Sequence, residues 1–422
     1  MAVTELHDQH PSTLALELIA GVPDTVQNPH DHYRALRDVA PVHRMELPTG
    51  DVVWVLTRYD DAKAVLASHH WGSAAGRADD AEGGLNILGM ELPDDLRPQG
   101  GVQPMLMQNP PDHTRIRGLF SRGFTPRRID EMRPRIEALV AGLLDQLGDG
   151  GEVDLLDVLG FPLPVAVIGE LVGVPSADWP RFRTLVRDGA ASLELNADVD
   201  TLRRSAAAMA EVRDYFVDLI EERRARPTDD LLTALLHVEE DGDRLSRDEL
   251  ISNVILLFAA GFETTTNLIG NGTAVLCRHP EQLARVRADR SLLPSMVEEI
   301  LRYESPVQVD GRVALDDTTL PDGSEVRAGE TALIFLGAAN RDPARFADPE
   351  TFDVGRTDNA PLSFAWGIHH CLGAGLARAE GAATFGALLD RFSSIELLDD
   401  PPNWRRSLTL RGLDSLHVRL AP

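Results

Sequence analysis

Lysine is almost missing from this chain of 422 residues: Lys and Arg together number 41, and Lys63 is the only lysine. The acidic residues number 67, which gives a formal net charge of −26. Proteins that bind nucleic acid present a basic face, so a surplus of negative charge this large argues against that class. We therefore expect no nucleic-acid partner.

Cysteine is scarce as well, with only Cys277 and Cys371. Two cysteines do not make a disulfide framework, and the low number suits a reducing compartment. The first residues lack the basic stretch and apolar run of a signal peptide. Nowhere do about 18 uncharged apolar residues follow one another, as a membrane-spanning helix requires. We expect a cytoplasmic protein with no membrane attachment.

The order of predicted elements indicates one mixed domain. Residues 29–40 predict a short helix, which a hairpin around the turn PTGD follows. From 112 to about 305 almost every segment indicates helix, interrupted by Pro and Gly, and residues 306–340 alternate as strands do. We predict a mainly α fold with a smaller β region, as a single domain over residues 29–422. An irregular N-terminal segment, 1–28, precedes it.

One helix stands out by its length, over residues 246–280. Ser246 and Glu249 form a capping box at its start. Its centre, from Ile251 to Ala260, is almost wholly apolar, and a helix that is apolar all round is a buried one. We predict a long helix through the centre of the molecule.

The segment FAWGIHHCLGAGLAR, residues 364–378, places Cys371 just before a predicted helix rich in small residues. Free N–H groups and the helix dipole at such an N-terminus stabilise a thiolate. Gly367 and Gly373 let the backbone approach something flat and bulky, and Phe364 is placed to cover the sulfur. These features favour a thiolate that binds a large partner.

Other roles for a cysteine compete with this interpretation. A lone cysteine is most often a small buried side chain, which is what we expect of Cys277. A zinc site needs a cluster of ligands, and His369, His370 and Cys371 are chain neighbours that cannot all turn to one tetrahedral ion. A cysteine hydrolase or redox protein needs a histidine near the thiol in space, and the sequence leaves that alternative open.

The cysteine segment resembles the haem-binding loop of cytochrome P450 enzymes, in which Phe and three further residues precede Gly-x-His-x-Cys-x-Gly. The matching residues are Phe364, Gly367, His369, Cys371 and Gly373. The chain departs from the pattern at Ala365, where the family usually has glycine. The resemblance implies a cytochrome P450 fold with the long central helix over the haem, and it implies that Cys371 is the axial ligand of the iron.

The six residues AGFETT lie midway along the central helix. Gly261 and the threonines can loosen the helical hydrogen bonds and open a groove, although a bent structural helix explains the same letters. In cytochromes P450 this pattern is the oxygen-binding groove. The resemblance therefore implies catalytic roles in proton delivery for Glu263 and Thr264, and it places Ala260 and Gly261 against the cofactor.

A haem carries two propionates, so cations should be aimed at them. His113 and Arg117 are spaced i, i+4 on one helix face. Arg312 lies in the first β segment after the predicted helices, and His369 lies in the cysteine loop. All four match the family pattern for haem binding. The resemblance also implies a buried structural ion-pair group, formed by Glu299, Arg302 and Arg356.

The implied activity is that of a monooxygenase that binds haem b (heme, iron protoporphyrin IX) through Cys371 and uses O₂ as co-substrate. One oxygen atom would enter a C–H bond or an alkene, and the other would leave as water. The chain has no G-x-G-x-x-G nucleotide domain, so electrons from NAD(P)H would arrive through a ferredoxin reductase and a ferredoxin. We expect the ferredoxin to meet a basic group formed by Arg115, Arg122, Arg127 and Arg128.

Family correspondence places several mainly aliphatic or small residues over the haem. They lie in the 72–107 segment, which we expect to act as a lid, in 180–205, at Leu256, Ala259 and Ala260, and in the stretches Val307 to Val309 and Leu410 to Leu413. These predict a roomy apolar pocket for a medium-to-large metabolite, such as a polyketide, macrolide, terpenoid or steroid-like compound. The aromatic content of 5% fits a pocket that does not rely on ring stacking.

Three rival functions remain at this level. A P450-fold enzyme could carry out oxidative coupling or cyclisation without oxygen insertion, and the intact Glu263–Thr264 pair weighs against it. A haem-binding sensor would bind the cofactor without turnover. A non-haem protein could use Cys371 as a hydrolytic or redox nucleophile.

Overall fold

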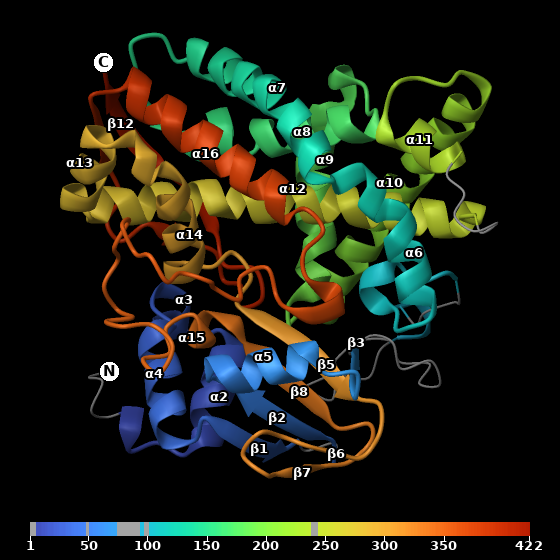
Figure 1. The fold of residues 1–422 in the computed structure, drawn as a ribbon, viewed down its shortest axis with the longest axis vertical. Helices are drawn as coiled ribbons and strands as arrows, with labels where there is room; N and C mark the ends of the chain where they lie inside the picture. Colours follow the sequence, from blue (N-terminus) through green and yellow to red (C-terminus); the bar gives the residue numbers. More distant parts are fainter. Residues whose placement is uncertain (1–5, 48–49, 74–92, 97–100, 238–243) are drawn as a thin grey trace.

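Helices dominate the molecule, and a smaller β region lies at one end of it (Figure 1). The computed structural model describes residues 6–47, 50–73, 93–96, 101–237 and 244–422. The helices are α2 Pro11–Ala20, α3 Pro23–Gln27, α4 His30–Val39, α5 Tyr59–Ala67, α6 Asp112–Ser121, α7 Pro126–Asp145, α8 Pro162–Val172, α9 Trp179–Ala190, α10 Val199–Ala225, α11 Leu231–His237, α12 Arg247–Arg278, α13 Pro280–Ala288, α14 Leu293–Tyr303, α15 Leu336–Ala339 and α16 Ala374–Arg391. The predicted fold class, mainly α with a smaller β region, is confirmed.

A five-stranded sheet forms most of the β region, in the order β1-β2-β8-β5-β3. Its strands are β1 Val42–Glu46, β2 Val52–Leu56, β3 Trp71–Ser73, β5 Val309–Ala314 and β8 Thr331–Phe335. The predicted hairpin is confirmed as β1 and β2, which pair antiparallel. Strand β2 also pairs in parallel with β8, where Val55 lies opposite Leu333.

Helices cover both faces of this sheet. Alternate residues of a strand point to opposite faces. Val53 and Val55 join a core cluster with residues of α2 and α4, whereas Trp54 and Leu56 join a cluster with residues of α5. A strand buried on both faces needs a continuous apolar run, and the sequence VVWVL of β2 supplies it.

Residues 6–28 are mostly helical, so the prediction of an irregular segment is wrong for this described part of 1–28. Helices α2 and α3 begin with Pro11 and Pro23 in the first turn, where the missing N–H of proline is tolerated. Leu14, Leu18 and Ile19 of α2 are buried and belong to the core cluster under the sheet. The apolar face of α2 therefore makes this segment part of the same core as the residues that follow it.

The remaining strands are short and join distant parts of the chain. Strand β12 pairs with both β4 and β9, β6 pairs with β7, and β10 pairs with β11. Their bounds are β4 Gly151–Asp154, β6 Thr318–Thr319, β7 Glu325–Val326, β9 Ser394–Leu397, β10 Asn403–Trp404, β11 Leu413–Ser415 and β12 His417–Ala421.

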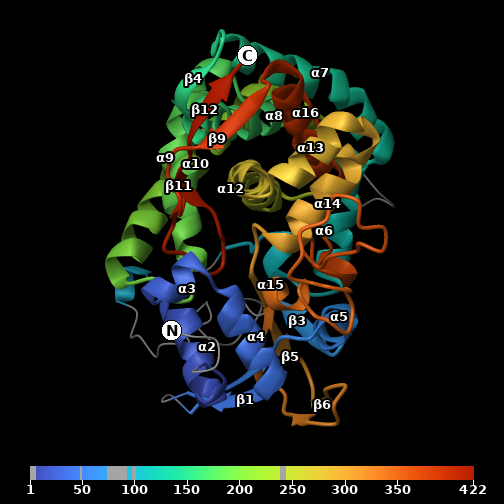
Figure 2. The ribbon, with the colours of Figure 1, turned by 90° about the vertical axis from the view of Figure 1, so that its left-hand side faces the viewer.

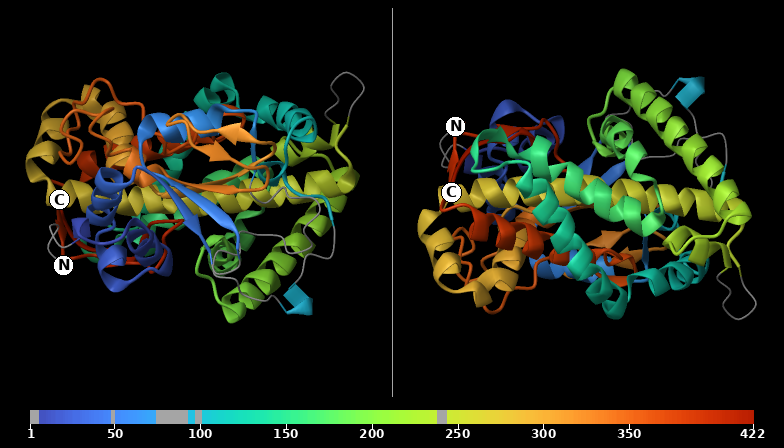
Figure 3. Two further views of the ribbon diagram at one scale, coloured as in Figure 1. Left: turned by 90° about the horizontal axis from the view of Figure 1, so that it is seen from below. Right: turned by 90° about the horizontal axis from the view of Figure 1, so that it is seen from above.

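Helix α12 runs through the middle of the molecule, end-on in Figure 2 and lengthwise in Figure 3, where it is yellow. The capping box is confirmed, because the Ser246 hydroxyl accepts the N–H of Glu249 and the Glu249 carboxylate accepts the N–H of Ser246. Helices α8, α10, α14 and α16 pack around it, which is why its centre is apolar all round. Across the described ranges, no helix combines the length and apolar character needed to span a bilayer.

His30 is expected to make stability depend on pH. Its ring is buried at the start of α4, with Nε2 3.3 Å from Oε2 of Glu304. Burial, and then the charge of Arg341, lower the pKa of His30 from 6.5 to about 4. Between these values the unfolded chain binds the proton and the folded protein does not, so acid favours unfolding. We expect the free energy of unfolding to fall as the pH drops from about 6.5 to 4.

Urea denaturation across that pH range measures the effect. The variant His30→Gln should lose this part of the pH dependence. A variant with the same slope as the wild-type protein would assign the slope to other groups.

Candidate functional site

The loop before α16 holds Cys371 in a defined backbone conformation. The N–H of Cys371 donates to the carbonyl oxygen of Phe364 at 2.9 Å. Gly367 has a φ of 74°, and a Cβ there would lie 2.2 Å from the carbonyl oxygen of Leu66, so only glycine fits. Ala365 has a φ of 55°. This left-handed conformation is easier for the glycine that the cytochrome P450 pattern usually has at that position.

The Cys371 side chain faces an interior space, because it is exposed although the protein encloses it on nearly every side. The position that a Cβ would take at Gly373 faces open space, with none of the described residues other than its chain neighbours within 4 Å. Burial raises the pKa of the Cys371 thiol, although the N–H of Gly373 and the charges of Arg117 and Arg378 act to lower it. The low pKa expected from the helix N-terminus is therefore not found for the thiol alone, and a bound metal would favour the thiolate.

Two histidines and two arginines meet beside this loop. They come from three separate elements: His113 and Arg117 of α6, Arg312 of β5, and His369 of the short helix η8 Gly367–His369. The ring centroids of His113 and His369 are 4.3 Å apart. The pKa of His369 is lowered to about 3, first by burial and then by the charges of the other three. The structure thus brings together the four residues that the sequence predicts to act together.

This cluster fits an anionic group. Both ring nitrogens of His113 and Nε2 of His369 are buried with no hydrogen-bond partner in the described part of the chain, and buried polar groups normally have one. Arg312 donates to the carboxylate of Asp310 at 2.5 Å. The four cationic or hydrogen-bond-donating side chains of the cluster thus share one carboxylate. A haem has two carboxylates at one edge, which this cluster could bind, and an iron, which the thiol of Cys371 could bind. The residues present therefore fit a haem.

One face of α12 is open near its middle, because Ala260 is exposed and Gly261 and Thr264 are half-buried, whereas Phe258 and Phe262 are buried. The hydroxyl of Thr264, one turn on, donates to the carbonyl oxygen of Ala260 at 2.7 Å. The helix is continuous over 260–265, so the opening expected at Gly261 is not seen. A Cβ at Gly261 would lie 3.3 Å from Ile168 of α8, which shows that the small size of this residue serves close helix packing.

Glu263 points away from Thr264, since successive residues of a helix are about 100° apart. Its buried carboxylate forms an ion pair with Arg405, which follows β10, while its Oε2 has no hydrogen-bond partner among the residues that the structure describes. Arg405 also donates to the carbonyl oxygen of Leu413 at 3.2 Å. A proton that passes between Glu263 and Thr264 therefore needs bridging water or a movement of the Glu263 side chain. No pattern in the sequence indicates Arg405 as a partner of Glu263, because 142 residues separate the two.

The structure joins the three residues of the predicted structural ion-pair group. Nε and Nη2 of Arg302 each lie 2.8 Å from a carboxylate oxygen of Glu299, and both side chains are fully buried. The other donors of Arg302 bind three backbone carbonyl oxygens between residues 340 and 351. Nε of Arg356 lies 3.1 Å from Glu299. The group ties α14 to the long connection that leads to the cysteine loop.

The basic group expected to meet a ferredoxin is partly neutralised. Arg115 forms an ion pair with Glu249 of α12 and 29% of its side chain remains exposed, so its place in a docking surface stays a prediction. Arg127 and Arg128 both pair with Glu131 of their own helix, although 88% and 51% of their side chains remain exposed. This surface is therefore less basic than the sequence suggests.

Most of the 72–107 segment, the expected lid, lies outside the described residues. Its described end is fastened to the central helix, because Met105 is buried and its N–H donates to Oδ1 of Asn253 at 2.7 Å. Two other stretches expected beside the haem do lie together, since Leu410 forms a β-bridge with Val307.

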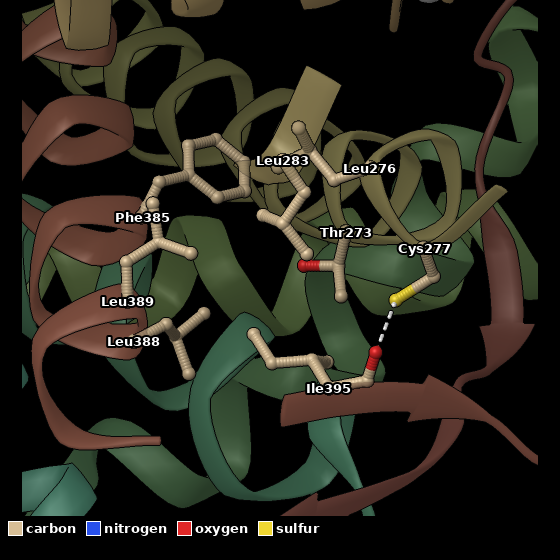
Figure 4. A pocket seen from close by; sticks show the side chains of 8 residues that line it. All are labelled: Thr273, Leu276, Cys277, Leu283, Phe385, Leu388, Leu389 and Ile395. Carbon is tan, nitrogen blue, oxygen red and sulfur yellow. Dashed lines mark hydrogen bonds between the residues drawn. The ribbon is translucent and has the colours of Figure 1, made fainter. Parts of the chain in front are cut away.

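Cys277 lies in a different environment, among apolar side chains of α12, α13, α16 and β9 (Figure 4). The cavity beside it has a volume of only about 10 Å³. Its thiol donates to the carbonyl oxygen of Ile395 at 3.4 Å, and burial raises its pKa to about 12. Cys277 is a packing residue, as expected from the sequence.

Comparison with known proteins defines the class. The family described as Cytochrome P450 matches residues 197–411. The chain is 43% identical to 6-deoxyerythronolide B hydroxylase of Saccharopolyspora erythraea, over 92% of this chain and 95% of that protein. It is 39% identical to cytochrome P450 monooxygenase PikC of Streptomyces venezuelae, over 96% and 94%. The solved structure of the bacillaene polyketide synthase cytochrome P450 PksS of Bacillus subtilis matches with a TM-score of 0.85 and 35% identity, covering 98% of this chain and 100% of that one.

The chain therefore belongs to the cytochrome P450 family and has its fold. It is a cytochrome P450 monooxygenase of secondary metabolism, an enzyme class that uses haem with a cysteine thiolate ligand and O₂. A non-haem cysteine hydrolase and a sensor without turnover are no longer needed to explain Cys371.

Proposed function

We propose that this protein inserts one atom of O₂ into a C–H bond or an alkene of a medium-to-large apolar metabolite. The substrate gains one oxygen atom, and the other atom leaves as water with two electrons and two protons. The observation that carries the proposal is the cluster of two histidines with unpartnered buried nitrogens and two arginines beside the accessible thiol of Cys371.

The candidate residues divide by the part of the haem that each would hold. Cys371 would bind the iron, and the loop residues Phe364 and Gly373 would lie beside the thiolate. Those that would bind the propionates are His113, Arg117, Arg312 and His369, and those that would border the opposite face are Ala260 and Gly261. When bound, the haem supplies the redox chemistry that activates O₂.

Residues of the chain itself deliver the protons to the site. The Thr264 hydroxyl lies on the side of α12 that borders the interior space, and the backbone carbonyl of Ala260 holds it in one orientation. Glu263 can accept a proton at Oε2, which no protein donor occupies, while Arg405 holds the carboxylate in place. We assign Thr264 to proton transfer into the site and Glu263 to its supply.

The variant Thr264→Val tests this assignment. Valine has the size of threonine but no hydroxyl, so the fold should persist while proton delivery fails. We expect the yield of product per O₂ consumed to fall about 10-fold or more, which is within the range for loss of a proton-transfer group, and hydrogen peroxide to rise correspondingly. The variant Thr265→Val, in the next position and buried, is the control. Equal yields for Thr264→Val and the wild-type protein would remove Thr264 from the relay.

Apolar metabolites of polyketide type are the substrates we propose. Two relatives are named for polyketide or macrolide chemistry, a 6-deoxyerythronolide B hydroxylase and a P450 of the bacillaene polyketide synthase. A panel of macrolactones and steroids can be screened by the spin-state change of the haem, and hits can be turned over under ¹⁸O₂. One ¹⁸O atom in the product supports the proposal, and a product without ¹⁸O refutes oxygen insertion.

Oxidative coupling or cyclisation is the second candidate. One observation favours it: Glu263 is bound to Arg405 and does not contact Thr264, so the relay is not assembled in this conformation. A desaturated or cyclised product without ¹⁸O in the same experiment would establish this activity.

A ferredoxin, reduced by NAD(P)H through its reductase, is the electron donor we propose. Its docking surface would include Arg127 and Arg128, whose side chains remain exposed. We expect Arg128→Glu to raise the ferredoxin concentration at half-maximal turnover about 3- to 10-fold, and added salt to do the same to the wild-type protein. The control is Arg133→Glu, an exposed arginine later on the same helix. Turnover that responds to neither change would place the donor elsewhere.

A further inference from the structure

A large cavity lies where the end of α3 and the start of α4 meet the C-terminal ends of α12 and α14. Figure 1 shows these helices on its left-hand side. The volume of the cavity is about 410 Å³, which is within the range of small-molecule sites. Among the described residues that line it, none belongs to the candidate haem site. Haem binding therefore does not account for this cavity.

Arginines outnumber carboxylates in the lining of the cavity. The four arginines are Arg34, Arg278, Arg341 and Arg411, and the three acidic residues are Asp31, Glu304 and Glu350. The chain as a whole has the opposite balance, with 67 acidic residues against 41 basic ones. A cavity whose charged side chains favour an anion is therefore not a consequence of the average composition.

Two of the arginines are buried and held in fixed positions. The side chains of Arg341 and Arg411 are only 5% and 4% exposed. The guanidinium of Arg341 lies 3.8 Å from the ring centroid of Tyr303, and that of Arg411 lies 3.7 Å from the ring centroid of Trp404. Arg341 also donates to the carbonyl oxygen of Tyr303 at 2.7 Å, and Arg411 donates to two backbone carbonyls of α3. Binding to such preorganised groups loses little side-chain entropy.

The carboxylates of the lining already have arginine partners. The ion pairs are Glu304 with Arg411, Glu350 with Arg341, and Asp31 with Arg34. The fourth arginine, Arg278, pairs with Asp400.

All four arginines nevertheless keep hydrogen-bond donors. A guanidinium has five N–H groups. Within the described part of the chain, none of the four uses more than three nitrogen atoms in hydrogen bonds to protein acceptors. At least two N–H groups on each arginine are therefore left for a ligand.

The cavity also has an apolar wall. Ala274 and Val275 of α12 and Trp404 of β10 line it and are buried. Arg34 and Arg278, in contrast, are 35% and 40% exposed, so arginines line the cavity from its mouth to its interior. Apolar walls with a few fixed polar groups are typical of sites for small organic molecules.

We propose that this cavity binds a small organic anion, with a carboxylate or phosphate group held by the arginines and an apolar body against α12 and Trp404. The planar fork of an arginine matches two oxygen atoms of either group. The site is separate from the haem chemistry, and its occupation does not require turnover.

Isothermal titration of the full-length, haem-loaded protein tests the proposal, with 4-phenylimidazole present so that the haem site is occupied. The probes are benzoate, phenyl phosphate, inorganic phosphate and benzamide. At least one of the two organic anions should bind about 10-fold tighter than benzamide, the neutral counterpart of benzoate, and the tighter of the two identifies the anionic group. Phenyl phosphate should bind tighter than inorganic phosphate, which has no apolar body, and added salt should weaken the binding.

A double variant, Arg34→Gln with Arg278→Gln, locates the binding. Both side chains are partly exposed, so the fold should persist. We expect the organic anion to bind about 10-fold weaker or more, because charge-assisted hydrogen bonds are lost. The control is Arg290→Gln, at an arginine that is 38% exposed, pairs with Asp390 and lies outside the lining. Its affinity should stay within about 2-fold of the wild-type value.

Three results would overturn the proposal. The first is the absence of binding by both organic anions at millimolar concentration. The second is equal affinity for benzamide, or for inorganic phosphate and phenyl phosphate, which would show that the charge or the apolar wall plays no part. The third is wild-type affinity in the double variant, which would place the anion elsewhere on the protein.

Discussion

Replacing Cys371 with serine should abolish turnover while the fold persists. Serine has nearly the same size, and it retains the backbone N–H that closes the loop onto Phe364. Its hydroxyl does not ionise near neutral pH, so no thiolate forms and electron donation to the iron is lost. We expect product formation to fall by about 10³-fold or more, equivalent to ~4 kcal/mol of transition-state stabilisation.

Because the histidine and arginine cluster is intact in this variant, we expect the purified protein to retain a fraction of the wild-type haem content. Haem content and product rate are therefore measured together on the purified protein. The matched control is Cys277→Ser, at a half-buried thiol whose hydrogen bond to Ile395 is 3.4 Å long, and its turnover should stay close to that of the wild-type protein. Normal turnover in Cys371→Ser would show that the iron ligand lies elsewhere.

Replacing Arg302 with methionine should cost a large part of the stability of the protein. Arg302 is completely buried, and its side chain donates two hydrogen bonds to Glu299 and three to backbone carbonyls. Methionine fills similar space but leaves the Glu299 carboxylate buried beside only Arg356 and a few neutral donors. Breaking one partner of a buried pair typically destabilises by about 3–5 kcal/mol. Native domains are stable by only about 5–15 kcal/mol in total.

Chemical denaturation of the variant measures this loss. The control is Arg285→Met, which breaks an ion pair with Asp353 whose side chains are 47% and 39% exposed. That change should cost less than about 1 kcal/mol. Similar losses for Arg302→Met and Arg285→Met would contradict the structural role.

The parts of the site that could be predicted are those whose residues lie close together in the sequence. The cysteine loop spans fifteen residues, so its glycines, Phe364 and Cys371 can be recognised together. His113 and Arg117 are one helical turn apart, and a helix places such a pair on one face. The capping box and the apolar centre of the central helix identify it from the sequence.

The missed features depend on contacts between distant segments. Arg405 and Arg411 hold partners 142 and 107 residues away, and no local pattern identifies either pair. The ion pair of Arg115 with Glu249 was missed as well, because Arg115 lies on α6 and Glu249 lies on α12. The N-terminal helices were missed although Pro11 and Pro23 are helix-starting signals, because α2 is stabilised mainly by packing under the sheet.

Figure 1 also explains why the chain was correctly expected to interleave its α and β parts. Strands β2 and β8 are neighbours in the sheet, yet most of the helical body lies between them in the sequence. A parallel pair needs a long crossover, and here that crossover contains α12 and most of the candidate site.

The most direct test of the central claim is the difference spectrum of the reduced wild-type protein with and without carbon monoxide. A haem bound through the Cys371 thiolate predicts a strongly red-shifted Soret band. A Soret band without that shift would mean that haem is bound but the thiolate is not its ligand. No haem band after expression with haem supplied would contradict the account of the site altogether.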